Sequence, residues 1–254
     1  MSEADVAIAD SAHPFEADRN LRRVLEVVGW VLVAAMLGTG LISVFTRMFF
    51  MGEATGTPAD TYDAFNVRYV LNPLVTWLHL LPALCIAATG PLQFIRRVRN
   101  KKRQLHRVSG RIYLTCGVIG AFSGLYLGAV HPFSGWQGPG ANEGFATIFF
   151  ASFTLFCLVK AYTTVRRRQF AAHREWVIRS WALMLGIGTE RILLGVMLTV
   201  TEIDIAVLFG LTFWMAAAIN IPVPSNPAMT VGLADHSHPK SGKATRQIPP
   251  NCRN

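Results

Sequence analysis

Charged side chains are scarce in this chain. Asp, Glu, Lys and Arg make up 15% of its 254 residues, whereas a typical soluble domain contains roughly 25%. The charges that are present are clustered, which leaves long stretches without any. A chain of this kind is not expected to form an ordinary water-soluble domain.

Motifs typical of soluble enzymes and metal sites are missing as well. The sequence has no phosphate-binding Walker loop, no dinucleotide fingerprint, no His-Glu-x-x-His zinc motif and no nucleophile elbow. Its four cysteines show neither a disulfide framework nor zinc spacing, because three of them lie in apolar stretches. Nucleotide-dependent chemistry, hydrolase chemistry and metal sites other than a haem iron therefore have no support.

Hydrophobic residues are abundant instead. They make up 52% of the chain, and the mean hydropathy is +0.35. The formal net charge of +9 also suits a nucleic-acid-binding protein, but the Lys and Arg residues lie in short runs beside apolar segments. The pattern favours a membrane protein whose partner is the lipid bilayer, and it excludes nucleic acid.

Six apolar segments approach the ~20 residues that a helix needs to cross a ~30 Å hydrocarbon layer. They are residues 27–46, 69–95, 112–130, 144–165, 176–200 and 205–219. The sequence therefore predicts an all-α integral membrane helix bundle of about six transmembrane helices. The domains would be an N-terminal segment 1–23, a transmembrane domain 24–223 and a polar tail 224–254, which its composition predicts to be disordered.

Two basic loops set the predicted orientation. The loops RRVRNKKRQLHR and RRRQFAAHR hold 11 of the 24 Lys and Arg residues, and loops of this kind stay in the cytoplasm. The loop HPFSGWQGPGANE contains no Lys or Arg and is expected on the outer side. With six spans, both termini are then cytoplasmic, and the predicted location is a bacterial cytoplasmic (inner) membrane.

The ends of the two basic loops resemble each other. They continue into LHRVSGRIYL and AHREWVIRSWAL, so that Arg111 and Tyr113 are echoed by Arg179 and Trp181. The echo suggests two related helix pairs, spans two with three and four with five. We expect these pairs to form a four-helix core, with spans one and six beside it.

His106 and His173 stand at the start of the third and fifth predicted spans, at the cytoplasmic boundary. Two imidazoles from two helices can bind a haem iron axially, and nearby arginines can pair with the haem propionates. These arginines are Arg107, Arg111, Arg174 and Arg179. The pattern predicts a b-type haem here, but the His-Arg pairs can also serve only as interfacial polar groups with positive charge on the inner side.

A second polar cluster is predicted near the outer side. Ionisable residues within a bilayer tend to face the bundle interior, and counting along the helices places His79, Glu190 and Arg191 at similar depths, with His131 at the end of the third span. Glu190 and Arg191 point about 100° apart on one helix, so we expect another partner, His79 or His131, for at least one of them. The cluster can be functional or can simply hold the helices together.

Glycines recur at intervals of three or four residues along the third predicted span, at Gly117, Gly120, Gly124 and Gly128. Such a stripe of small residues permits close helix packing. A groove of this kind can also admit a flat ring system.

Several motifs resemble a bacterial family of multi-pass membrane proteins known as a domain of unknown function. They are a Gly-Pro-x-Gln step at Gly90–Gln93, a His-Arg followed by Gly-Arg-x-Tyr at His106–Tyr113, and a His-Arg-x-Trp followed by Ile-Arg-Ser at His173–Ser180. The resemblance extends over about Pro73 to Leu198. It implies a membrane fold and topology but no activity.

The layout is also similar to that of cytochrome b561-like membrane proteins, in which histidines from two different core helices hold each haem. Because the fourth predicted span contains no histidine, a single inner haem is expected rather than two. This similarity implies a haem electron-transfer protein that acts with a quinone or another membrane redox partner.

Two other functions remain open from the sequence. A cofactor-free, proton-coupled transporter or channel would use His79, Glu190 and Arg191 as a polar path. A structural or assembly subunit of a membrane complex would use the basic loops to bind anionic lipid or protein. Neither the substrate nor the oligomeric state follows from the sequence.

Overall fold

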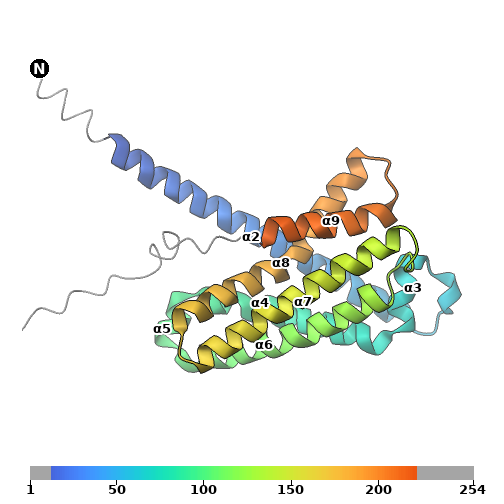
Figure 1. Ribbon diagram of the computed structural model, residues 1–254, viewed down its shortest axis with the longest axis horizontal. Helices are drawn as coiled ribbons and strands as arrows, with labels where there is room; N and C mark the ends of the chain where they lie inside the picture. The colour runs from blue at the N-terminus through green and yellow to red at the C-terminus, as the bar shows by residue number, and fades with distance from the viewer. Residues whose placement is uncertain (1–12, 222–254) are drawn as a thin grey trace, which may run out of the picture. The chain divides into compact units, whose positions relative to one another are not determined.

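The computed structural model of the protein describes residues 13–221, and these form helices joined by short connections. The helices are α2 (His13–Glu53), the 3₁₀ turn η1 (Ala59–Thr61), α3 (Ala64–Leu71), α4 (Pro73–Phe94), α5 (Arg96–Lys101), α6 (Arg103–Leu125), the π-helical turn η2 (Tyr126–Val130), α7 (Pro139–Arg166), α8 (Phe170–Val200) and α9 (Ile205–Asn220), as Figure 1 shows. The predicted tail, residues 224–254, lies outside the described residues.

Five of these segments are long and apolar enough to cross a membrane: Arg23–Glu53, Pro73–Phe94, Arg103–Val130, Pro139–Arg166 and Phe170–Val200. The prediction of an all-α membrane helix bundle is confirmed. The sixth predicted span corresponds to α9, which has only 16 residues. A helix of that length reaches ~24 Å at 1.5 Å per residue, less than a ~30 Å hydrocarbon layer.

The long helices form a ring. Helix α4 packs along α6, α6 along α7, and α7 along α8, while α2 contacts both α8 and α4 and so closes the ring. The pairing of α4 with α6 and of α7 with α8 agrees with the predicted helix pairs. Helix α2 is nevertheless part of the ring instead of standing beside a four-helix core, and α9 covers α7 and α8 from outside.

Helix α2 extends far beyond its predicted start at residue 27. Its first part, drawn in blue in Figure 1, leaves the ring, and Leu21, Val24, Val28 and Trp30 are all exposed there. Further along, α2 approaches α8 closely, because a Cβ atom added to Gly188 would lie 1.9 Å from the backbone oxygen of Met36. The glycine therefore allows the two backbones to touch.

The second predicted span is divided into two helices, which corrects its predicted start at residue 69. Asp63 caps the start of helix α3, and its side chain accepts a hydrogen bond from the Asn66 N–H at 2.9 Å. The helix ends before Pro73, because proline lacks an N–H and disfavours the helical conformation of the residue before it. That residue, Asn72, has φ −124° and ψ 57°.

The predicted cytoplasmic half of the ring is filled by side chains. Tyr113, Leu158, Trp181 and Leu185 form a buried core there, and the hydroxyls of Tyr113 and Ser180 are 2.9 Å apart. A Cβ atom on Gly90 would lie 1.9 Å from the Trp181 ring, so this glycine leaves the space that the indole occupies. Trp181 and Leu185 of this core also line a cavity within the ring.

Candidate ligand site within the helix ring

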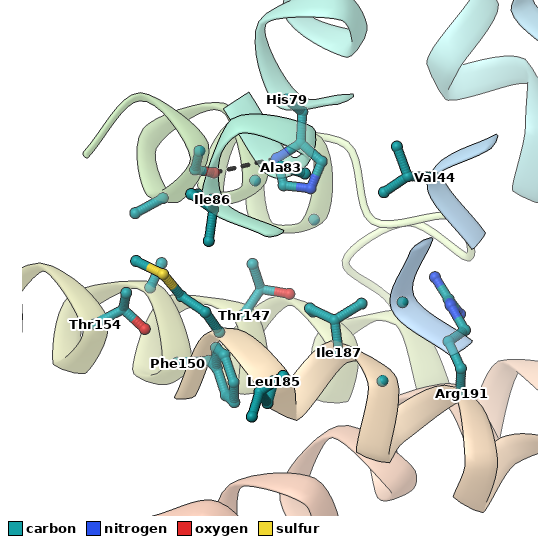
Figure 2. Close-up of a pocket in the computed structure, with 18 of the residues that line it drawn as sticks. Val44, His79, Ala83, Ile86, Thr147, Phe150, Thr154, Leu185, Ile187 and Arg191 are labelled. Atoms are coloured by element: carbon teal, nitrogen blue, oxygen red, sulfur yellow. Dashed lines mark hydrogen bonds between the residues drawn. The ribbon is translucent and has the colours of Figure 1, made fainter. Parts of the chain in front are cut away.

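A cavity of about 250 Å³ lies inside the helix ring. Residues from α2, α4, α6, α7 and α8, together with some from α3, η2 and α9, surround it, and Figure 2 shows several of them around the open space. Most of the lining is apolar, including Met36, Ile86, Phe150, Leu185 and Ile187. Apolar pockets with a few placed polar groups are typical of binding sites for small molecules.

His79 is one of the few polar groups that face this cavity. It lies in the first half of α4, and its Nδ1 atom is 3.1 Å from the backbone oxygen of Gly120 and 3.2 Å from Oγ of Ser123. Its Nε2 atom has no hydrogen bond within the part of the chain that the structure describes, and Figure 2 shows the ring beside the open space. The imidazole is thus fixed at one nitrogen and open to a ligand at the other.

The glycine stripe of α6 makes room for side chains around the cavity. Added Cβ atoms would lie 2.9 Å from the His79 ring at Gly124, 2.6 Å from the Thr147 hydroxyl at Gly128 and 2.7 Å from Met184 at Gly117. The stripe therefore permits close packing at these three positions, and all four of its glycines, Gly120 included, line the cavity. Here it brings side chains of α4, α7 and α8 against the α6 backbone.

Helix α7 contributes two hydroxyl groups to the cavity, from Thr147 and Thr154. Figure 2 shows both on the α7 side, across from His79. Oγ1 of Thr154 is buried and has no hydrogen-bond partner among the described residues. A buried polar atom without a partner is costly, so a ligand that hydrogen-bonds to it would remove this cost.

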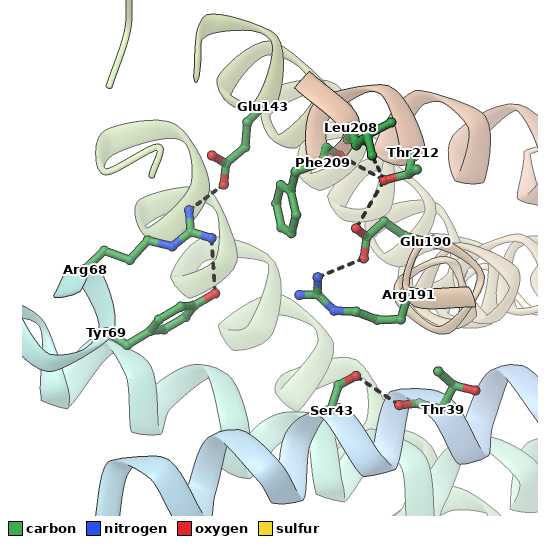
Figure 3. Close-up of polar contacts among 10 residues, drawn as sticks. All are labelled: Thr39, Ser43, Arg68, Tyr69, Glu143, Glu190, Arg191, Leu208, Phe209 and Thr212. Atoms are coloured by element: carbon green, nitrogen blue, oxygen red, sulfur yellow. Dashed lines mark hydrogen bonds and ion pairs between the residues drawn. The ribbon is translucent and has the colours of Figure 1, made fainter. Parts of the chain in front are cut away.

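A buried ion pair also lines the cavity. Arg68 of α3 and Glu143 of α7 are 5% and 1% exposed, and they form an ion pair (Figure 3). Arg68 also lies near the backbone oxygens of Leu127 and His131, at 3.5 and 3.4 Å, while Glu143 accepts a hydrogen bond from the Phe133 N–H at 2.9 Å. The pair thus connects α3, η2 and the connection between η2 and α7.

The charge of Arg68 is stabilised by its surroundings. Burial alone would lower the pKa of its guanidinium, but Tyr69 and the carboxylate of Glu143 outweigh burial and raise this pKa above its ordinary value. Arg68 therefore stays cationic, and Glu143 is its counter-ion.

Glu190 and Arg191 make a second polar contact beside the cavity. Nη1 of Arg191 lies 3.3 Å from Oε2 of Glu190, and Thr212 of α9 donates to Oε1 at 3.3 Å (Figure 3). The predicted partners, His79 and His131, are not used. The arginine side chain is long enough to fold back to its neighbour, despite their different directions on the helix.

The structure brings some of the predicted outer cluster together. His79 and Arg191 line the same cavity. His131 does not line it: its ring packs against Tyr126, with centroids 5.0 Å apart. Glu190 is completely buried behind Arg191.

The two inner histidines lie apart from this cavity, which neither of them lines. They are close enough to influence each other electrostatically. Nδ1 of His173 is 2.8 Å from the backbone oxygen of Ala161, and Nδ1 of His106 is buried without a partner among the described residues. A haem between them stays a prediction.

The four arginines predicted as propionate partners have different surroundings. Arg107 and Arg111 are exposed, whereas Arg174 and Arg179 are partly buried. Arg179 lies 3.6 Å from Glu175 and 4.6 Å from the centre of the Trp176 ring.

Sequence reasoning missed the Arg68–Glu143 pair. Both residues were assigned to segments outside the spans, where charges are unremarkable. The one available signal was the position of Glu143, immediately before the apolar segment 144–165 in a loop without Lys or Arg. A carboxylate that becomes buried at the start of an apolar segment needs a counter-ion, and this loop has no Lys or Arg to supply one.

Comparison with known proteins supports the membrane fold. No curated protein and no solved structure matches the chain, so the similarity to cytochrome b561-like proteins gains no support from them. A family model does match residues 76–225, which is more than half of the chain and includes His79, Glu143 and Arg191. The chain thus belongs to the family described as "Predicted membrane protein (DUF2306)".

Proposed function

We propose that this membrane protein binds a lipid-soluble ring compound of the quinone class in the cavity within its helix ring. The observation that carries the proposal is His79, which is fixed through Nδ1 and turns its free Nε2 toward an apolar cavity. A polar atom on a preorganised ring in apolar surroundings can orient an oxygen of such a ligand.

The size of the cavity supports a single ring system. Its volume is about 250 Å³, whereas an apolar cavity of ~150 Å³ holds benzene and pockets for larger drug-like ligands measure ~300–1,000 Å³. A substituted benzoquinone ring suits a space between these sizes. Its alkyl tail would lie among the apolar side chains of the lining.

The proposal includes a location. We expect the protein in a bacterial inner membrane, with α5 and the connection after α7 on the cytoplasmic side, because both are rich in basic residues. His79 lies near the start of α4, at the opposite end of that helix from α5. The ligand would then bind in the outer half of the bilayer.

Binding should be measurable as thermal stabilisation. The full chain in lipid nanodiscs is mixed with a short-tailed benzoquinone at about one hundred times its Kd, which should raise the unfolding temperature by about 5 °C. Ala83→Leu, which fills space beside His79, should remove this shift. Ala218→Leu, the same change at an exposed position of α9 that does not line the cavity, should retain it.

The same experiment can contradict the proposal. An equal shift for the wild type and for Ala83→Leu would mean that the compound acts elsewhere, on the lipid or on the surface. The absence of any shift in the wild type would exclude this ligand class.

A b-type haem between His106 and His173 is a second candidate. The observation that favours it is the contact of His173 Nδ1 with the Ala161 oxygen, because metal-binding histidines commonly donate their other N–H to a backbone carbonyl. If this is correct, the purified protein shows a Soret absorption band that His106→Ala and His173→Ala each remove. A colourless protein after expression with added haem would exclude it.

A further inference from the structure

Hydrogen bonding fixes the position of the proton on His79. A backbone carbonyl oxygen can only accept a hydrogen bond, so the 3.1 Å contact between Nδ1 and the Gly120 oxygen requires a proton on Nδ1. In a neutral imidazole, the other nitrogen then carries a lone pair and no proton. Nε2 is therefore an acceptor, and it is the nitrogen that is open to the cavity.

Ser123 supports the same assignment. Its hydroxyl lies 2.8 Å from the backbone oxygen of Ile119, one turn earlier on α6. The hydroxyl proton is thus donated to the helix, and Oγ of Ser123 presents a lone pair to Nδ1 at 3.2 Å. The Gly120 oxygen and Oγ of Ser123 therefore both act as acceptors, and Nδ1 is the donor.

The charges around the cavity favour the neutral form of the ring. The cations Arg68 and Arg191 line the same cavity as His79, and they would repel a second positive charge. The carboxylates that could oppose them, Glu143 and Glu190, lie against Arg68 and Arg191 respectively. His79 is thus an acceptor in apolar surroundings, without a carboxylate partner among the described residues.

We infer that the cavity selects the hydroxyl form of its ligand, the quinol, over the carbonyl form, the quinone. This inference rests on the proposed function and adds the oxidation state that binds. A quinol hydroxyl can donate to Nε2 of His79, whereas a quinone carbonyl places its own lone pairs against that of Nε2. Leaving such a group unpaired should cost about tenfold or more in affinity.

Three ligands with the same ring and tail test the selection. They are the hydroquinone, the quinone and the hydroquinone dimethyl ether, in which methyl groups replace both hydroxyl protons. Their Kd values are measured anaerobically on the full chain in nanodiscs. The hydroquinone should bind about ten times more tightly than either of the other two.

Two variants separate His79 from the rest of the cavity. His79→Phe retains a ring but lacks the acceptor, so the three ligands should bind with similar affinity. Met184→Leu changes the apolar lining of the same cavity without altering a hydrogen-bonding group and is the control, which should keep the preference for hydroquinone. If His79→Phe does not fold, the affinities of the wild type for hydroquinone and for its dimethyl ether decide whether a donated hydroxyl proton is needed.

The outcomes distinguish the two proposals. If the wild type binds all three ligands equally, or prefers the quinone, the inference is wrong while the proposed binding stands. A preference that persists in His79→Phe would likewise overturn it. Failure of all three ligands to bind would overturn the proposed function itself.

Discussion

Replacing Glu143 with Gln should destabilise the protein by about 3–5 kcal/mol, because it leaves the cation of Arg68 buried without its counter-ion. The two side chains are 5% and 1% exposed, so water cannot replace the lost carboxylate. The measurement is thermal unfolding of the purified protein in detergent, where the midpoint should fall by about 10 °C.

Glu175→Gln is the matched control. This carboxylate lies 3.6 Å from Arg179 and is 42% exposed, and an exposed ion pair contributes only about 0–1 kcal/mol. The double variant Arg68→Met with Glu143→Leu, which removes both charges, should recover most of the lost stability. If it is no more stable than Glu143→Gln, the unpaired charge is not the cause of the loss.

The substitution Gly188→Ala should force α2 away from α8. The new methyl carbon would lie 1.9 Å from the oxygen and 2.6 Å from the carbonyl carbon of Met36. These atoms belong to the backbone, so no change of rotamer can relieve the overlap. Overpacking of this kind costs about 1–3 kcal/mol or more, and thermal unfolding in detergent measures it.

Gly195→Ala on the same helix is the control for Gly188→Ala. Nothing lies within 4 Å of the position that its new methyl carbon would occupy. Because alanine is the better helix former by about 1 kcal/mol, this change should leave the unfolding temperature equal or slightly higher. Equal destabilisation by both substitutions would show that the contact between α2 and Met36 is not responsible.

Hydropathy was sufficient to predict most of the fold. A bilayer selects long apolar helices so strongly that five of the six predicted segments correspond to helices of spanning length. The second span was predicted to start at residue 69, whereas α4 starts at Pro73. The apolar run 69–95 continues through this proline, and hydropathy does not register that proline lacks a backbone N–H. The place of α2 in the ring also escaped prediction, since it depends on a close approach at Gly188.

The candidate site could be predicted only in part. His79 and Arg191 stood out because polar residues are rare inside apolar segments, and both line the cavity. The cavity itself depends on how side chains from several helices leave space between them, and no spacing in a single segment shows this. Arg68 and Glu143 come from segments that are 75 residues apart, so their pairing is a tertiary contact without a local pattern.

The π-helical turn η2 has an evolutionary consequence. Its Tyr126 oxygen accepts from the His131 N–H five residues later, at 3.2 Å, so the turn contains one residue more than an α-helical turn. Deleting one residue there would replace it with an ordinary α-helical turn and so change the directions of the side chains within the turn itself. Gly128 and Leu127 could not then both keep their places at the cavity. Among related chains, a one-residue gap at this point would identify those that have lost this wall of the site.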